Sequence, residues 1–106
     1  MKKEFQRILG GFIRLHILHH AAGQAVYGQW MMEELREHGY RISAGTLYPM
    51  LRGLERDGLL RSEDDPATPR KRLYRITPAG EEGLREARER LRELFHEVES
   101  GGRSHE

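Results

Sequence analysis

The sequence contains no cysteine, which excludes disulfide bonds and thiolate metal sites. It also lacks any apolar run approaching the ~20 residues that a membrane-spanning helix requires. Its first residues include Lys2 and Lys3, with Arg7 and Arg14 soon after, so the apolar region of a secretory signal is missing. Together these absences predict a cytoplasmic protein with no membrane partner.

Catalytic signatures are missing as well. The sequence has no nucleophile paired with a base, no phosphate-binding loop and no pair of carboxylates in a fixed context. We therefore predict that the chain is not an enzyme and needs no cofactor. Its 106 residues are enough for one domain with a modest core, and chains of this size often gain buried surface by forming oligomers.

An excess of one charge is also absent, because the net charge is only +1 although 33% of the residues are charged. The distribution is uneven, however. Residues 1–80 carry 13 lysines and arginines against 9 acids, whereas residues 81–99 carry 4 arginines against 7 glutamates. A basic body with an acidic C-terminal segment is consistent with one surface facing DNA, although a solvated surface can produce the same pattern.

Apolar periodicity predicts two helices in the first 40 residues. Residues 5–22 repeat apolar side chains at three- and four-residue steps, but Gly10-Gly11 weakens the middle. This region is either one long helix or a short arm followed by a helix from about Phe12. After a short turn, a second helix is expected from about Val26 to His38, and Gly39 stands where a left-handed C-terminal cap is expected.

A third helix and a hairpin follow. Ser43 is a good N-cap for this helix, which carries an inner leucine stripe and ends at Gly58. Residues 59–63 and 71–76 read as two strands, and residues 64–68 form the loop between them. The order of three helices and then a hairpin is typical of a winged helix-turn-helix, with the third helix as the recognition helix.

The C-terminal segment predicts a long helix. Thr77 is a suitable N-cap and Pro78 a suitable first residue, and the helix is expected to run to Glu99. The predicted fold is therefore mainly α with a small antiparallel β-hairpin. It divides into a winged helix-turn-helix domain at 1–77, a C-terminal dimerisation helix at 78–99 and a disordered tail at 100–106.

The third helix has a start suited to contact with DNA. Its opening residues are small or carry hydroxyl groups, and a helix N-terminus attracts phosphates. Tyr48 and Arg52 are four residues apart, so both side chains can enter one groove. Pro49 should cost one helical hydrogen bond or cause a local kink. The alternative is a buried helix of a small α/β domain, in which Tyr48 and Pro49 are merely packed.

The hairpin supplies a second set of cations. Such side chains neutralise phosphates or enter a minor groove, although charged edge strands are also common in proteins that bind no DNA. Asp64 and Asp65 would have to point away from the DNA or pair with nearby arginines. The residues predicted to contact DNA are Ser43, Ala44, Gly45, Thr46, Tyr48, Pro49, Arg52, Arg70, Lys71 and Arg72.

The last helix has a one-sided apolar stripe that needs a partner. We expect the first helix of a second subunit to pack there, which would set two recognition helices about 34 Å apart. The alternative is packing of this helix within a monomer. The residues predicted at the dimer interface are Phe5, Leu9, Phe12, Ile13, Leu84, Leu91, Leu94, Phe95 and Val98.

A set of residues spread over the helices and the hairpin forms a recognisable pattern. Its positions are Tyr27-Gly28, Gly39-Tyr40, Ser43, Gly45 to Tyr48, Pro49, Leu51, Leu54-Glu55, Gly58-Leu59, Pro69 to Lys71, Tyr74, Ile76-Thr77 and Gly80. With this pattern the sequence resembles the PadR family of transcriptional regulators over about residues 12–80. The resemblance implies a repressor-type regulator that binds a palindromic operator as a homodimer, through the third helix and the wing. It also implies that the C-terminal helix dimerises and that a small-molecule effector is possible.

Three further interpretations stay open. His16 and His20 are four residues apart and could chelate one metal ion, but with no cysteine and no acid at the matching step the set is incomplete, so we predict no metal site. Trp30 and Met31 could line an effector pocket or simply belong to the core. The chain could also be a winged-helix protein-interaction module that does not bind DNA.

Overall fold

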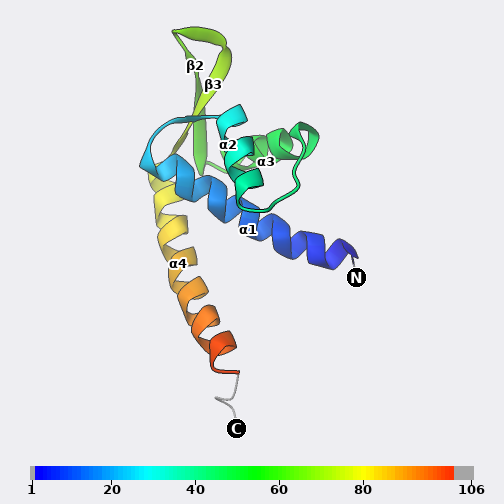
Figure 1. Cartoon of the computed structure of the whole chain (residues 1–106). Coiled ribbons are helices and arrows are strands. Elements are labelled where there is room, and N and C mark those ends of the chain that lie inside the picture. The colour runs from blue at the N-terminus through cyan, green and yellow to red at the C-terminus, as the bar shows by residue number, and fades with distance from the viewer. Residues whose placement is uncertain (1, 102–106) are drawn as a thin grey trace.

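The computed structural model describes residues 2–101, apart from the side chain of Pro69. These residues form four helices and one three-stranded antiparallel sheet (Figure 1). In chain order the elements are α1 (Lys2–Gly23), β1 (Val26–Tyr27), α2 (Gly28–Glu37), α3 (Ala44–Arg56), β2 (Leu60–Asp65), β3 (Thr68–Ile76) and α4 (Pro78–Glu99). The predicted mainly helical fold with a small hairpin is therefore confirmed.

The first helix is continuous through Gly10-Gly11, which decides between the two possibilities left by the sequence. Gly10 is buried in α1, and a methyl group there would lie 3.8 Å from the side chain of Met50 in α3. Arg14 also donates a hydrogen bond to the Gly10 carbonyl. Burial of Ile13, Ile17 and Leu18 in the core holds α1 in place despite the weak helix propensity of the two glycines.

The predicted start of the second helix is wrong. Residues 26 and 27 were expected to open that helix, and instead they form the strand β1. Val26 pairs with Tyr74 and Tyr27 pairs with Leu73, so β1 extends the hairpin to the sheet order β1-β3-β2. A β-branched residue followed by an aromatic one suits a strand. The local pattern could not reveal this strand, since its partner lies far along the chain.

The hairpin is longer than predicted. Its strands β2 and β3 leave only Pro66 and Ala67 as the connection, with an irregularity in register between Asp64 and Asp65. We call the β2–β3 hairpin the wing. Figure 1 shows it rising from one end of the helical body.

The core is built from the inner faces of α1, α2 and α3, closed by the sheet. The predicted stripe of Leu47, Leu51 and Leu54 is buried, as α3 requires in order to be held on its domain. Gly39 and Gly58 have the positive φ angles expected of residues that end helices. The other buried apolar residues are Ile13, Ile17, Leu18, Ala21, Val26, Met31, Leu35, Ile42, Leu60, Tyr74 and Leu84.

Helix α4 begins as expected and then leaves the body. The Thr77 hydroxyl accepts a hydrogen bond from the Gly80 amide, and Leu84 joins the core. Beyond that point the helix extends away from the other elements (Figure 1). The radius of gyration is accordingly 15.5 Å, against about 13 Å for a compact chain of this length.

Ser100 and Gly101, expected to belong to the disordered tail, cap α4 through hydrogen bonds to the carbonyls of His96 and Val98. Residues 102–106, the rest of that predicted tail, lie outside the described residues. Within residues 2–101, no helix is both long and apolar enough to cross a bilayer.

Candidate nucleic-acid interface

A groove of about 630 Å³ separates the wing from α3 and from the start of α2. We call it the wing groove. Residues predicted to contact DNA line it from both sides, namely Tyr48 and Arg52 from α3, and Arg70, Lys71 and Arg72 from the wing. Sequence reasoning did not assign the other lining residues to a site, namely Tyr27, Gly28, Gln29, Glu55 and Tyr74. The fold therefore brings five of the ten predicted residues to one concave surface.

The remaining predicted residues of α3 are exposed at its N-terminal half. Ser43 occupies the N-cap position with an extended backbone, but its hydroxyl donates to the Thr46 hydroxyl and does not bond a backbone amide of the helix. Ala44 and Gly45 are also exposed and carry little or no side chain. The start of α3 is therefore lined by small, exposed residues, which leaves room for a ligand at the helix N-terminus.

Pro49 does not interrupt α3, which is continuous from Ala44 to Arg56. Because proline has no N–H, the carbonyl of Gly45 loses its usual partner four residues on. Both residues are exposed, so water can satisfy that carbonyl. One helical hydrogen bond is therefore lost, as predicted, but it is lost on the solvent side of the helix, where water can replace it.

Tyr48 lies directly against the backbone of Gly28, the first residue of α2. A methyl group on Gly28 would come within 2.8 Å of Tyr48 Cε1 and 2.9 Å of its hydroxyl oxygen. Such an approach is possible only because glycine has no Cβ. The α2 backbone thus fixes where the half-buried phenol lies in the wing groove, on the same helix as Arg52.

Tyr27 ties the wing to the helical body. Its hydroxyl donates a hydrogen bond to Asp65, which also accepts the Ala67 amide at 3.1 Å. The Tyr27–Asp65 hydrogen bond is the largest cause of the raised pKa of Tyr27 and of the lowered pKa of Asp65. Lys71 Nζ lies 5.1 Å from the centre of the Tyr27 ring, within the range of a cation–π contact. The pair Tyr27-Gly28, already part of the family pattern, was the available signal for this role.

Arg72 is neutralised within the wing. Its Nη1 lies 3.0 Å from Asp64 Oδ1, and its Nε and Nη2 donate to the hydroxyl of Ser62. That hydroxyl in turn donates to Glu55 of α3 at 2.7 Å. Of the two possibilities left by the sequence for Asp64, the structure has the pairing with an arginine, and this pairing leaves Arg72 with less charge to offer than its neighbours.

Three other cations around the wing groove take part in no ion pair. Within residues 2–101, Arg52, Arg70 and Lys71 have no carboxylate within ion-pair distance, and all three side chains are exposed. An exposed cation that forms no ion pair is available to an anionic ligand, and the wing groove presents three of them.

The residues predicted at a dimer interface fall into two groups. Ile13 and Leu84 are buried in the core of the single chain, so they stabilise the protomer itself, and Leu9 is half-buried. The others are exposed, from 38% for Phe12 to 64% for Val98. The exposed residues of the predicted set are Phe5, Phe12, Leu91, Leu94, Phe95 and Val98.

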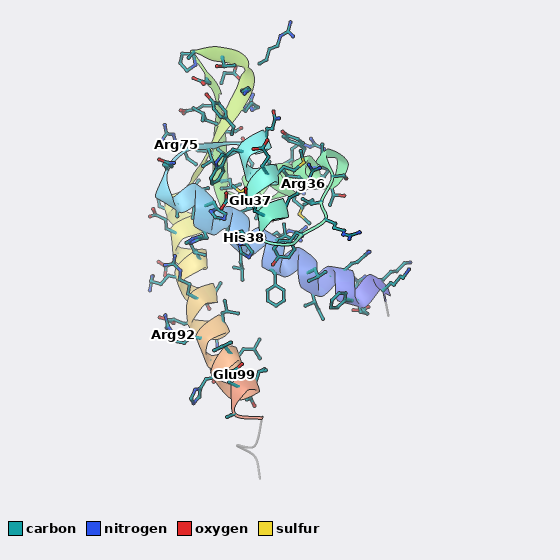
Figure 2. All side chains as sticks on the ribbon, in the orientation of Figure 1. Arg36, Glu37, His38, Arg75, Arg92 and Glu99 are labelled. Carbon is teal, nitrogen blue, oxygen red and sulfur yellow. The ribbon has the colours of Figure 1, made fainter. Side chains whose placement is uncertain are left out.

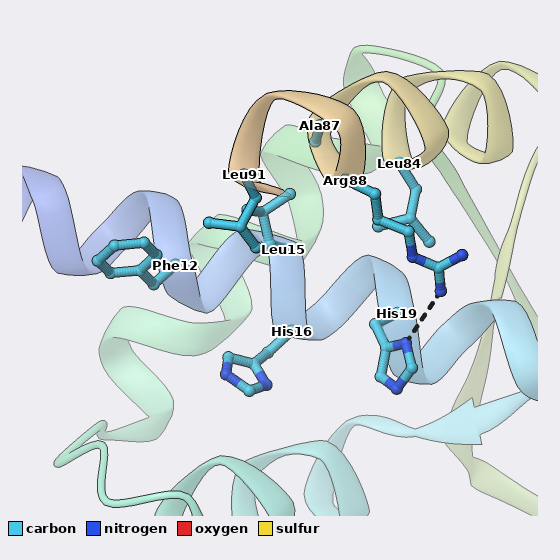
Figure 3. Close-up of a pocket in the computed structure, with 8 residues that line it drawn as sticks. All are labelled: Phe12, Leu15, His16, His19, Leu84, Ala87, Arg88 and Leu91. Atoms are coloured by element: carbon cyan, nitrogen blue, oxygen red, sulfur yellow. Dashed lines mark hydrogen bonds between the residues drawn. The ribbon is translucent and has the colours of Figure 1, made fainter. Parts of the chain in front are cut away.

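An apolar cavity of about 210 Å³ opens where α1 and α4 diverge. Figure 3 shows Leu84, Ala87 and Leu91 of α4 across from Phe12 and Leu15 of α1. Its polar end is formed by His19 and Arg88, whose Nδ1 and Nη2 atoms are 3.4 Å apart. This cavity continues the exposed apolar stripe of α4 toward the body.

The residues considered for an effector pocket lie elsewhere. Met31 is only 1% exposed and packs in the core, which removes it from any pocket lining. Trp30 is 39% exposed and stacks edge-on against His20, with the ring centres 5.5 Å apart. The two side chains therefore point to different environments.

Comparison with known proteins agrees with this geometry. Residues 17–86 match the transcriptional regulator PadR-like family. Transcriptional regulator Rv3488 of Mycobacterium tuberculosis is 55% identical over 104 residues, covering 97% of this chain and 94% of that protein. A PadR family regulator from Eggerthella lenta has a TM-score of 0.78 at 30% identity, covering 97% of this chain and 92% of that one. A PadR-like regulator from Bacillus cereus has a TM-score of 0.81 at 25% identity, covering 92% and 98%. The chain therefore belongs to the PadR-like family of DNA-binding transcriptional regulators, which are not enzymes.

Proposed function

We propose that this regulator is a repressor that binds a palindromic operator as a homodimer, through α3 and the wing. The observation that carries the proposal is the wing groove, where Arg52, Arg70 and Lys71 stand without ion-pair partners in the described chain. Cations of this kind neutralise DNA phosphates and release condensed counterions. A protein that binds an operator works where the DNA is, so we also propose that this protein is cytoplasmic.

Different parts of the surface would make different contacts. Arg70 and Lys71 on the wing suit phosphates or a minor groove, since they are exposed and attached to a strand anchored by Tyr27. Tyr48 and Arg52 suit base edges in the major groove, because α3 carries both on one face. The open N-terminal turn of α3 suits a phosphate.

The exposed apolar stripe of α4 supports the homodimer. Leu94, Phe95 and Val98 are each more than half exposed, on a helix that extends away from the body. Large apolar side chains gathered on one face of a projecting helix usually mark an interface. A two-fold dimer presents two copies of α3, and a palindromic operator requires them about 34 Å apart.

Selection of duplexes from random-sequence DNA tests the DNA-binding part. We expect the wild-type protein to enrich a palindrome and to bind it with strong salt dependence. Arg70→Ala should weaken binding and reduce the slope of log K against log salt by about 1, whereas Tyr48→Ala should weaken binding without changing that slope. Arg92→Ala is the matched control, since Arg92 is an exposed arginine on α4 far from the wing (Figure 2). If no sequence is enriched, the chain is the interaction module without DNA binding that we considered as the alternative.

Sedimentation equilibrium tests the homodimer. The wild-type protein is expected at twice the 12.4 kDa chain mass. Phe95→Glu should give monomers, because it places a charge in the middle of the apolar stripe, while leaving the protomer folded since Phe95 is 63% exposed. A wild-type protein that stays monomeric at micromolar concentrations contradicts the homodimer.

A further inference from the structure

Three histidines from two helices meet at the junction of α1 and α2. His16 and His20 lie one turn apart on α1, and His38 is the C-cap residue of α2. Each offers one nitrogen atom, and the three nitrogens lie within 4.8 Å of one another. Figure 2 shows His38 at the end of α2, against α1. The sequence alone suggested only the first two histidines, and the fold supplies the third.

The cluster contains a polar atom that the protein does not satisfy. Nε2 of His20 is buried and has no hydrogen-bond partner among the described residues. An unpaired buried nitrogen costs free energy, so it calls for a ligand that the protein itself does not provide. The His38 side chain is 44% exposed, which leaves a route from solvent to the cluster.

The spacing is close to that of a metal site. Three nitrogens at most 4.8 Å apart surround a centre about 2.8 Å from each, whereas Zn–N bonds measure about 2.0–2.1 Å. Each imidazole would therefore move by about 0.7 Å to close on an ion, which small side-chain rotations can provide.

Neighbouring side chains hold the rings in place. Tyr40 packs edge-on against His16 at 5.3 Å, and Trp30 packs edge-on against His20 at 5.5 Å between ring centres. Glu34 Oε2 lies 3.6 Å from His38 Nε2, so a small side-chain rotation would let this carboxylate accept a hydrogen bond from the histidine and orient it, as carboxylates do in metal sites. Its charge would also offset part of the charge of a cation.

We propose that His16, His20 and His38 form a site for a divalent transition-metal ion of the kind that imidazole prefers, such as Zn²⁺, Co²⁺ or Ni²⁺. Three histidines leave the fourth position of a tetrahedral ion for water. Glu34 is a positioning residue that acts through His38. An ion here would tie α1 to the end of α2, just before the loop that leads to α3.

Metal titration of the full, untagged chain tests this site in the absence of DNA, so failure of the proposed operator binding would not affect the result. We expect calorimetry to give one Zn²⁺ per chain, and Co²⁺ to give the visible absorption of a four-coordinate ion. Glu34→Gln should weaken Zn²⁺ binding by about 10–100-fold. His16→Gln, His20→Gln and His38→Gln should each weaken it by more.

His19→Gln is the matched control. His19 lies beside the cluster, with its ring 5.1 Å from that of His20, but it is not one of the three converging residues. Its variant should bind Zn²⁺ as the wild type does. Because His38 is an exposed C-cap, His38→Gln should keep the metal-free melting temperature and lose only the rise caused by Zn²⁺. Unchanged Zn²⁺ affinity in His38→Gln, or no binding by the wild type at millimolar Zn²⁺, would overturn the site.

Discussion

Gly28→Ala is the sharpest test of how the fold places Tyr48. The new methyl group would lie 2.8 Å from Tyr48 Cε1 and 2.9 Å from its hydroxyl oxygen, against the ordinary carbon contact of about 3.5–4.0 Å. The ring must therefore retreat by about 0.7–1.2 Å. The backbone of Gly28 does not itself resist alanine, since the only positive φ angles in residues 2–101 belong to Gly39, Gly58 and Gly101.

The magnitudes separate stability from binding. Turning Tyr48 about 30° from its preferred rotamer costs about 0.5–1.5 kcal/mol. Replacing glycine by alanine stabilises the fold by about 0.4–1 kcal/mol, because it reduces the conformational entropy of the unfolded chain. The free energy of unfolding should thus change by less than about 1 kcal/mol. A base-edge contact is worth about 1–3 kcal/mol, so misplacing Tyr48 should weaken operator binding about 5- to 150-fold.

Fluorescence anisotropy on the selected duplex measures this effect, and a double-mutant cycle isolates it. In a Tyr48→Ala background, Gly28→Ala should not weaken operator binding further, because the tyrosine ring that the new methyl group would strike is gone. Gly83→Ala is the control, since a methyl group there meets nothing within 4 Å and should leave binding unchanged. Additive losses in the cycle, or wild-type affinity in Gly28→Ala, would refute the reasoning.

Three further predictions concern stability and ionisation. Leu51→Ala should lower the free energy of unfolding in urea by about 2–5 kcal/mol, because Leu51 is completely buried; a loss below that range would mean that the site collapses around the smaller side chain. Gly80→Ala should cost about 1–3 kcal/mol in thermal unfolding, because the added carbon would overlap the carbonyl oxygen of Leu59; a melting temperature equal to that of the wild type would contradict this close approach. Tyr27→Phe should raise the pKa of Asp65 toward its ordinary value, since the Tyr27 hydrogen bond is the largest cause of the lowering. Ionised Asp65 stabilises the fold above the ordinary aspartate pKa, and this contribution is lost as the pH falls through the lowered pKa, so the variant should differ most from the wild type near neutral pH. Carboxyl NMR titration measures this shift, and an unchanged pKa would show that Tyr27 does not control Asp65.

Sequence reasoning succeeded where the physical cause is local. Thr77 and Pro78 set the start of α4, because capping acts within one turn. The leucine spacing set the buried face of α3, because periodicity is a property of a single helix. Cations on α3 and on the wing were also recognisable, because their residue types and the hairpin pattern are visible along the chain.

Prediction from the sequence was wrong or incomplete where a residue interacts with residues far away in the chain. Val26-Tyr27 became a strand only because β3 was there to pair with it. Arg72 looked equivalent to Arg70 in the sequence. In the folded wing, however, Arg72 forms an ion pair with Asp64 and donates a hydrogen bond to Ser62. These outcomes depend on which side chains converge from separate elements, and no local pattern contains that information.

Patterns along the chain were enough to identify the family, the order of the helices, the start and end of α4 and the residue types available for contact with DNA. Folding alone established which cations form no ion pair, how Gly28 places Tyr48, and that His38 joins His16 and His20. The difference lies in the range over which each interaction acts. Propensity, capping and periodicity act over a few residues of one segment, whereas charge compensation, close packing and metal-ligand geometry arise when distant segments meet in space.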